Sequence, residues 1–538
     1  MSFYKIINLT ITMRAITPFK ALLLSVISAL LLSAAWPVVG FVPLIFIAFV
    51  PLLLVHNYCV ANNKSLFAYS QVTFLLWNFT VNYWVCNAEL TAGIMASVAN
   101  AMLMSGVVLL FNWGYQKLTT KFALWLLPAL WISFEYLHMH WDITWPWLTL
   151  GNVFSESTPY IQWYEITGHL GGSWWVWAVN ILVFRLITIQ RTETSIKKYV
   201  PLVLTLVIPV TYSLLRFATY TEITNPTKVA VIQPNIDPYN EKFGTLGESA
   251  QLARILALAS TVIDDSVRYV FSPETSLITN ANEVELDSNE SYKTLRTYLK
   301  QYPNLNIIMG ISTYRFYEPT QTPSLTAHKN SEGYYFDTYN TAMQMHGTDS
   351  IQLYHKSKLV PGAEKMPFPI LLKPLEKLAL NLGGTVGSLG VQPQASVFTD
   401  SKTGVKIAPV ICYESIYGQY VASYVRKGAQ LIGIITNDGW WGNTPGYKQH
   451  LSYARLRAIE TRRYVVRSAN TGISAIINQR GDVVKHTYWW QDDAFTATVN
   501  LNASITPYVL LGEYPAYIAM FLLSYFIALI IKRHPKFN

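Results

Sequence analysis

The chain has 538 residues, of which 51% are hydrophobic, 14% aromatic and only 13% charged. Soluble globular proteins average roughly a quarter charged residues, so this composition excludes a disordered chain or a nucleic-acid-binding polymer, despite the formal net charge of +9. The charges are unevenly distributed, because residues 1–226 carry 18 Asp, Glu, Lys and Arg whereas residues 227–538 carry 53. We therefore expect a membrane domain followed by a globular domain that is large enough to bury its own core.

Eight apolar segments are long enough to cross a bilayer, whose core of roughly 30 Å takes about 20 residues of helix. We predict transmembrane helices at 20–36, 38–56, 66–86, 92–113, 122–139, 172–190, 199–218 and 514–531. Residues 1–218 would form a membrane domain with seven helices, and the eighth would follow the globular domain. The first segment resembles a secretory signal, but the apolar segment directly behind it favours an uncleaved anchor.

The basic residues predict the orientation, because Lys and Arg accumulate in cytoplasmic loops. With the N-terminus inside, the cytoplasmic segments contain Lys5, Arg14, Lys20, Lys64, Lys117, Lys121, Arg191, Lys197, Lys198, Lys532, Arg533 and Lys536. The opposite loops, near 37, 87–91 and 140–171, contain no Lys or Arg. This split predicts that residues 219–512 lie in the periplasm of a Gram-negative bacterium and that both termini are cytoplasmic.

Two features of the membrane half carry polar or aromatic groups. Glu135 is a carboxyl group inside a predicted helix, which is either functional or hydrogen-bonded to a neighbouring helix or to the outer loop. The outer loop 141–177 contains seven Trp residues. We interpret most of them as an interfacial aromatic belt.

From Thr227 onward, short β-branched runs alternate with amphipathic stretches, which is typical of an α/β layered domain. We predict strands at Lys228–Gln233, Tyr269–Ser272, Asn306–Ser312, Thr341–Met345, Ile351–His355, Lys406–Cys412, Leu431–Thr436, Val465–Ser468 and Ser474–Asn478. Helices are expected near 246–264, 289–302, 415–427 and 447–463.

Three polar residues follow apolar runs at expected strand ends, where the sites of such sheets collect: Glu274, Lys356 and Cys412. Each alone has an ordinary explanation, as a helix cap, a solvated lysine or a small core residue. Their joint occurrence in this order, 82 and then 56 residues apart, predicts a catalytic set.

The cysteines limit the kinds of site. Cys59, Cys86 and Cys412 are too few and too scattered for a disulfide framework or a zinc site, so an important cysteine would act alone. Asn437-Asp438-Gly439 lacks converging ligands and is interpreted as a turn rather than a cation site. We expect no metal or other cofactor.

The Glu-Lys-Cys order resembles the nitrilase superfamily, whose triad lies at strand ends of a four-layer αββα sandwich. With the flanking helices, the whole chain is similar to the apolipoprotein N-acyltransferase family. Further matching motifs are Pro146-Trp147-Leu148, Val231–Ile236, Thr436–Gly442, Gln449-His450 and Ala454–Glu460. The resemblance implies a multi-pass α-helical membrane domain plus a nitrilase-like αββα sandwich at 227–505.

The resemblance also implies the chemistry. A fatty acyl chain would move from a membrane phospholipid, through a Cys412 thioester, to the α-amino group of the diacylglyceryl-cysteine of a bacterial lipoprotein. Glu274 would act as the base, and Lys356 would stabilise the thiolate and the oxyanion together with a backbone N–H. The supporting residues implied are Glu364, Tyr413 and Glu414. The enzyme would be a monomer in the inner membrane.

Two other functions use the same features. A membrane-tethered nitrilase-type amidase would have the same triad, but one anchor helix suffices for tethering whereas eight favour access to lipids. A transporter with an external binding domain would need paired intramembrane charges, and beyond Glu135 the predicted helices offer few.

Residues 365–380 are too apolar for an ordinary loop of a soluble domain. Phe368, Ile370, Leu371 and Leu372 form a cluster, followed by Leu375, Leu378 and Leu380, and the stretch also carries Lys365, Lys373 and Lys377. Either the apolar residues pack on the sandwich core, or they form an arm on the outer leaflet that closes over the thioester, with Gly383-Gly384 as its hinge.

Overall fold

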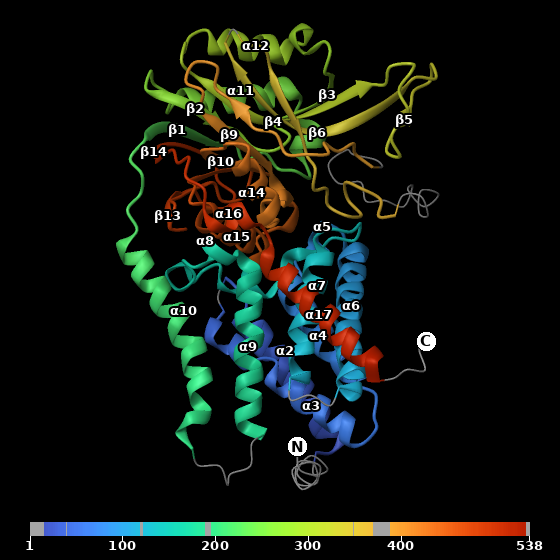
Figure 1. The fold of residues 1–538 in the computed structure, drawn as a ribbon. Coiled ribbons are helices and arrows are strands. Elements are labelled where there is room, and N and C mark those ends of the chain that lie inside the picture. Colours follow the sequence, from blue (N-terminus) through green and yellow to red (C-terminus); the bar gives the residue numbers. More distant parts are fainter. Residues whose placement is uncertain are drawn as a thin grey trace.

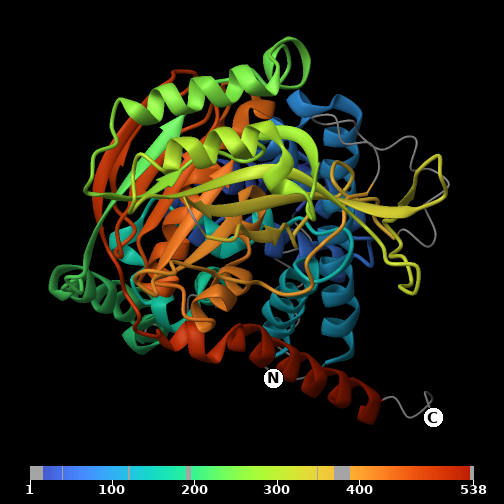
Figure 2. The ribbon, with the colours of Figure 1, turned by 90° about the horizontal axis from the view of Figure 1, so that it is seen from above.

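The computed structural model describes residues 16–38, 40–118, 122–188, 195–347, 349–368 and 388–533. A bundle of apolar helices carries an α/β sandwich on one of its ends (Figure 1). Seen from above, α10 and α17 reach beyond the edge of the sandwich (Figure 2). The arm predicted at 365–380 is described only as far as Phe368, and its hinge also lies outside the described residues. So do Lys5, Arg14, Lys121, Arg191 and Lys536.

The bundle contains α2 (Pro18–Ala35), η1 (Val42–Phe46), α3 (Val50–Ala61), α4 (Phe67–Asn82), α5 (Val85–Ala88), α6 (Leu90–Lys117), η2 (Ala123–Trp125), α7 (Leu126–His138), α9 (His169–Thr188), η6 (Ile196–Tyr199), α10 (Val200–Thr219) and α17 (Tyr514–Arg533). Six spans among the described residues are long and apolar enough to cross a membrane: Pro18–Ala35, Val42–Ala61, Leu90–Lys117, His169–Thr188, Ile196–Thr219 and Tyr514–Lys532. The segments predicted at 66–86 and 122–139 are helical as α4 and α7, but these helices have only 16 and 13 residues.

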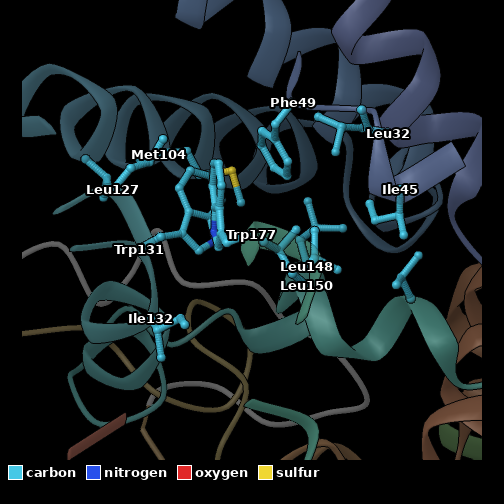
Figure 3. Packing of buried hydrophobic residues seen from close by; sticks show 14 of the residues in the cluster. Leu32, Ile45, Phe49, Met104, Leu127, Trp131, Ile132, Leu148, Leu150 and Trp177 are labelled. Carbon is cyan, nitrogen blue, oxygen red and sulfur yellow. The ribbon is translucent and has the colours of Figure 1, made fainter. Parts of the chain in front are cut away.

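The bundle core combines large aromatic side chains with aliphatic ones (Figure 3). Phe49 stacks on Trp177 with ring centroids 4.2 Å apart, and Trp131 meets both rings edge-on. Phe49 lies in the short connection between the 3₁₀ turn η1 and helix α3. Asn180 satisfies the backbone there, because its side chain accepts from the N–H of Phe49 at 2.9 Å and donates to the carbonyl of Ile45 at 2.8 Å. Such partners are required where water is excluded.

Glu135 has one hydrogen-bond partner in its own helix, α7, and one in the outer loop. Its Oε1 accepts from Trp131 Nε1 at 3.1 Å and from the backbone N–H of Leu150 at 2.8 Å. Leu150 begins the 3₁₀ turn η4 (Leu150–Phe154) of the outer loop. The carboxyl group therefore links α7 to that loop, which is the structural alternative stated above.

The sandwich has two sheets. The eight-stranded sheet has the order β14-β1-β2-β4-β6-β5, with β3 on β4 and β7 on β6, and the six-stranded sheet has the order β13-β12-β11-β10-β9-β8. The first contains β1 (Pro226–Gln233), β2 (Val267–Phe271), β3 (Leu277–Asn282), β4 (Asn306–Phe316), β5 (His328–Lys329), β6 (Tyr335–His346), β7 (Gln352–His355) and β14 (Asp493–Asn500). The second contains β8 (Phe398–Thr399), β9 (Lys406–Ile411), β10 (Leu431–Thr436), β11 (Val465–Ala469), β12 (Ala475–Ile477) and β13 (Val483–His486).

All nine predicted strands are present, and β3, β5, β8, β13 and β14 were not predicted. Helices α11 (Glu248–Ser260) and α12 (Glu290–Leu299) cover the outer face of the eight-stranded sheet, and α14 (Gly418–Arg426) and α15 (Pro445–Thr461) cover the six-stranded sheet (Figure 1). Between the sheets, Phe271 of β2 packs on Gly433 of β10, where an added Cβ atom would lie 2.4 Å from the phenyl ring. The predicted αββα layering is therefore confirmed.

The α14–α15 layer lies between the six-stranded sheet and the bundle. On α15, Gln449 accepts from Trp147 Nε1 at 2.7 Å and donates to the carbonyl of Pro37 at 3.0 Å. Tyr453 accepts from Trp36 Nε1 at 3.2 Å and donates to the carbonyl of Trp147 at 3.1 Å. Trp147 and Trp177 are fully buried, so the prediction of an interfacial belt is wrong for these two residues. Trp147 is covered by α15 of the sandwich, whereas Trp177 packs on Phe49 and Trp131 inside the bundle.

Candidate active site

The three residues predicted at strand ends come from both sheets. Glu274 follows β2 and Lys356 follows β7 in the eight-stranded sheet, whereas Cys412 follows β9 in the six-stranded sheet. Their exposed fractions are 6%, 1% and 9%, respectively. A buried charge requires partners, so the contacts of these side chains define what the site can do.

Lys356 joins two carboxylates. Its Nζ donates to Glu274 Oε1 at 3.0 Å and to Glu364 Oε1 at 2.7 Å. Asn340 Nδ2 donates to the same two oxygens, at 2.8 and 3.1 Å. The backbone N–H of Asn437 donates to Glu274 Oε2 at 3.1 Å. The site thus holds one ammonium group between two carboxylates, and the Glu274 carboxylate accepts hydrogen bonds on both oxygens.

These contacts keep the pair ionised. Burial opposes the charge of Glu274, but the Lys356 ammonium and the Asn340 hydrogen bond outweigh it and hold the pKa of Glu274 below its usual value. Burial also opposes the charge of Lys356, and the two carboxylates nevertheless raise the pKa of Lys356 well above its usual value. At neutral pH the site therefore contains a carboxylate that can accept a proton and a fixed positive charge.

Cys412 begins the 3₁₀ turn η10 (Cys412–Ile416) with a backbone φ of +49°, a left-handed conformation that is uncommon for a residue with a side chain. The carbonyl of Cys412 accepts from Ser415 Oγ at 2.8 Å and contacts His450 Nε2 at 3.2 Å. Burial, with the charge of Glu274 added, raises the pKa of the Cys412 thiol. The thiol is therefore neutral in the resting site and must lose its proton as it attacks.

The space for Glu274 depends on a glycine in β4. A Cβ atom at Gly310 would lie 2.5 Å from Glu274 Cα and 2.4 Å from Thr275 N. The backbone N–H of Gly310 instead donates to the carbonyl of Pro273 at 2.9 Å, and its carbonyl accepts from Ser276 N at 2.7 Å. The turn that carries Glu274 can therefore pack directly on β4.

A second buried network supports the cysteine turn from behind. His450 Nε2 also contacts Ser415 Oγ at 2.9 Å, and its Nδ1 lies 3.0 Å from Asp438 Oδ1. The other oxygen of Asp438 pairs with Arg467. Burial opposes the charge of Asp438, but Arg467 and His450 hold the pKa of this carboxyl below its usual value. Asp438, interpreted above as part of a turn, begins the 3₁₀ turn η11 (Asp438–Trp441) and anchors this network.

Glu414 connects the two sheets beside the site. Its Oε1 accepts from Tyr354 OH at 2.6 Å and from the backbone N–H of Ser357 at 2.7 Å. Its Oε2 accepts from the N–H of Ile411 at 2.9 Å. Burial raises the pKa of Glu414. This carboxyl group fixes the backbone on the C-terminal side of Lys356, whereas Glu364 contacts the ammonium group directly.

Tyr413 connects the cysteine turn to the bundle. Its hydroxyl donates to the carbonyl of Thr144 at 3.0 Å, and its ring stacks on Trp145 with centroids 6.4 Å apart. Thr144 and Trp145 belong to the outer loop that follows α7. The position of Cys412 is thus tied to the membrane half by the next residue in the chain.

Comparisons with known proteins cover both halves. The family model described as carbon-nitrogen hydrolase matches residues 228–506, and the one described as apolipoprotein N-acyltransferase N-terminal domain matches residues 28–182. A protein of Chlorobaculum tepidum named apolipoprotein N-acyltransferase is 31% identical over 507 residues, which cover 91% of this chain and 92% of that protein. The chain belongs to the apolipoprotein N-acyltransferase family.

A second relative agrees with this assignment. A protein of the same name from Geobacter metallireducens is 27% identical over 518 residues, with 92% of each chain covered. The solved structure of an amidase from Nesterenkonia sp. AN1 aligns with 54% of this chain and 98% of its own, at 14% identity and a TM-score of 0.36. Because the family match includes the membrane half, it favours the acyltransferase interpretation over the amidase alternative.

In this member of the apolipoprotein N-acyltransferase family, sequence reasoning missed two site residues. Asn340 lies just before a predicted strand. Lys242, in the π-helical turn η7 (Glu241–Thr245), is buried and donates from Nζ to the backbone carbonyl of Glu274 at 2.9 Å. Burial lowers the pKa of Lys242 to about 7. Neither residue belongs to a motif with a characteristic spacing, and only the contacts with Glu274 identify them.

Among the described residues, no group of three or more His, Cys, Asp and Glu side chains is arranged to hold a metal ion. The chemistry available to the site is that of a buried thiol beside a carboxylate and an ammonium group.

Proposed function

We propose that this protein moves a fatty acyl chain from a glycerophospholipid to the α-amino group of a lipoprotein's N-terminal diacylglyceryl-cysteine. The observation that carries the proposal is the buried arrangement of Glu274 and Lys356 next to the Cys412 turn, in a chain whose two halves both match the family. All these groups come from one chain, which favours a monomeric enzyme.

In the first half-reaction, Glu274 takes the thiol proton while Cys412 attacks the ester carbonyl of the phospholipid. Lys356 remains protonated and stabilises the oxyanion together with a backbone N–H near Tyr413. The C–O bond of the ester then breaks, and the lysophospholipid alkoxide takes the proton from Glu274. The products are a Cys412 thioester and a lysophospholipid.

In the second half-reaction, the neutral α-amine of the acceptor attacks the thioester carbonyl. Glu274 accepts the amine proton and returns it to the departing Cys412 thiolate, which leaves an amide and the free thiol. The reference pKa of an α-amine, about 7.7–8.0, means that a sizeable fraction is neutral near pH 7. Both substrates are anchored by acyl chains, so the enzyme has to work at the membrane surface.

The topology proposed has eight crossings, a periplasmic sandwich and cytoplasmic termini. Three helix ends contact the sandwich: Trp36 after α2 bonds to Tyr453, Asn87 before α6 bonds to the carbonyl of Trp441, and His169 in α9 bonds to Glu460. At the opposite ends of the helices lie Lys20, Lys64, Lys117, Lys197, Lys198 and Lys532. This distribution supports a cytoplasmic location for those ends.

A labelling experiment tests this topology. A membrane-impermeant thiol reagent should label the variant Ser288→Cys in intact spheroplasts, and Lys536→Cys only after lysis. The parent chain, with its own three cysteines, is the control for background labelling. The reverse pattern would contradict the orientation.

Mass spectrometry tests the reaction. The purified protein mixed with phospholipid should carry a fatty acyl adduct on the peptide that contains Cys412, and Cys412→Ala should carry none. Initial rates with both substrates varied should give parallel double-reciprocal lines, because one nucleophile serves two lipids in turn. N-acylation of a lipopeptide by Cys412→Ala, or intersecting lines, would contradict the thioester mechanism.

A further inference from the structure

Two adjoining hollows lie where the bundle meets the sandwich, beside the loop that carries Lys356. Their volumes are about 490 and 310 Å³. Met139, His140 and Lys358 line both of them. The larger hollow extends between the outer loop and Lys365, and the smaller one extends along α14. Glu274, Lys356 and Cys412 do not line either hollow.

The smaller hollow is lined by three cations. Lys358 Nζ lies over the rings of Tyr417 and Tyr420, at 5.3 and 5.5 Å from their centroids. Arg426 and Lys427, at the end of α14, donate to backbone carbonyls. Within the described parts of the chain, no carboxylate lies within 4.0 Å of these three cationic groups. Their charges are therefore available to an anion.

The acidic groups of the lining do not cancel these charges. Asp142, in the larger hollow, pairs with Lys365 at 3.1 Å. Glu513, in the smaller hollow, is buried and lies 3.9 Å from His140 Nε2. Burial, with the charge of Glu460 added, raises the pKa of Glu513 to about 7, so this carboxyl group is only partly ionised at neutral pH. The lining is positive on balance.

The hollows lie at the level where two apolar helices end. Met139 and His140 directly follow α7, and Glu513 directly precedes α17. The two helices pack together, with the rings of Tyr136 and Tyr517 5.9 Å apart. The phosphates of a bilayer lie just beyond the ends of such apolar segments. An anion at this level is therefore a lipid phosphate rather than a dissolved one.

We propose that the hollows bind the headgroup phosphate of the phospholipid that donates the acyl chain, with Lys358 as its main partner. The proposal rests on the proposed function and adds the basis of donor selection. Glu414 accepts from the backbone N–H groups of Ser357 and Lys358, at 2.7 and 3.2 Å, and so fixes the loop between the catalytic lysine and the phosphate site. Because Lys356 and Lys358 are two residues apart in the chain, their Cα atoms are at most about 7 Å apart.

The experiment compares two acyl donors with identical chains, phosphatidylglycerol and diacylglycerol, in detergent micelles with the full-length protein. Formation of the Cys412 thioester is followed by mass spectrometry. The wild type should prefer the phospholipid. Lys358→Gln should lower this preference about tenfold, mainly by raising KM for the phospholipid, because a charge-assisted contact is lost. Lys358→Arg should retain most of the preference.

Two further variants keep the test decisive. Lys300→Gln removes an exposed charge at the end of α12, far from the bundle, and should leave the preference as in the wild type. Lys427→Gln alters an exposed member of the cation group, so it tests the hollow even if Lys358→Gln folds poorly. A wild-type preference in both Lys358→Gln and Lys427→Gln would overturn the proposal.

A soluble competitor separates a lipid site from a site for free phosphate. We expect sn-glycerol 3-phosphate to compete only at millimolar concentrations. Tight competition by it, combined with unchanged donor preference in Lys358→Gln, would assign the hollow to a dissolved anion and overturn the proposal. A wild-type protein that forms no Cys412 adduct with either donor would instead contradict the proposed function, so the two failures are distinguishable.

Discussion

The two outer helix layers of the sandwich occupy equivalent places in the fold but have different surroundings. Helix α12 is amphipathic: Tyr292 and Leu295 face the eight-stranded sheet while Glu290 and Lys293 pair in solvent. Helix α15 has almost no exposed face, and its buried side includes Gln449, His450, Arg457 and Glu460. The polar side chains of α15 contact the bundle, whereas those of α12 contact solvent.

The residues of the candidate active site come from both sheets and therefore have these different surroundings. Glu274 and Lys356 extend from the sheet whose outer layer faces water, whereas Cys412 extends from the sheet whose outer layer is held by the bundle. Tyr413 bonds directly to the outer loop, and His450 of α15 contacts the carbonyl of Cys412. We infer that the nucleophile is positioned by the sandwich together with the membrane half, and the base by the sandwich alone.

The largest effect should follow from removing the base. Glu274→Gln keeps the size of the side chain but cannot accept the thiol proton, so Cys412 acylation should slow by about 10³-fold. The rate of adduct formation measures this. Because the pKa of Glu274 is lowered, its carboxylate stays ionised as pH falls from 7 to 5, and wild-type acylation should not decline in that interval on its account. Glu290→Gln, in exposed α12, is the matched control. A loss of less than tenfold in Glu274→Gln would exclude its role as base.

The comparison of the two layers predicts different costs for deleting an ion pair. In α15, Arg457 Nη2 donates to Glu460 Oε1 at 3.0 Å, and both side chains are fully buried. Arg457→Met should lower the free energy of unfolding by about 3–5 kcal/mol, because it leaves a buried charge without its partner. In α12, Lys293 pairs with Glu290 at 2.7 Å and both side chains are exposed, so Lys293→Met should cost less than about 1 kcal/mol.

Thermal unfolding in detergent, monitored by circular dichroism, measures both variants. Equal shifts of the melting temperature would show that the ion pair of α15 stabilises the protein no more than the ion pair of α12. The proposed difference between the two helix layers would then be wrong.

A smaller effect on the rate of acylation is expected from changing His450, which contacts the backbone of Cys412. His450→Gln removes the imidazole that contacts the Cys412 carbonyl but leaves the thiol, Glu274 and Lys356 in place. We expect kcat for acylation to fall about tenfold to a hundredfold with little change in KM, because the left-handed conformation of Cys412 loses support. Asp438→Asn, which weakens the orientation of the same imidazole, should act in the same direction. A change confined to KM would mean that the network serves binding instead.

The smallest effect concerns Lys242 on the sandwich side. Its pKa of about 7 in the folded protein lies below the value of about 10.4 expected in the unfolded chain. The unfolded state therefore binds more protons between these values, and wild-type stability should rise by about 1 kcal/mol between pH 7 and pH 8. Lys242→Met should remove this rise. Parallel pH profiles of the melting temperature for the two proteins would contradict the assignment.

Sequence reasoning reached the three residues proposed as catalytic because strand ends have a local signature. An apolar β-branched run followed by a polar residue marked Glu274, Lys356 and Cys412, and each follows a strand in the structure. It did not reach Asn340, which bonds to Glu274 across 66 residues of the chain. The strands β3, β13 and β14 were missed because their partly exposed sequences lack a continuous apolar run.

By itself, the sequence determined the features that depend on neighbouring residues: the apolar segments of the bundle, nine strands of the two sheets and the order of the proposed catalytic residues. The tertiary structure decided which buried polar groups meet. Gln449 bonds to Trp147 and Pro37, which lie about 300 and 400 residues earlier in the chain. A buried polar group must find a partner, but nothing near it in the sequence states which one, because the partner is chosen by packing between elements.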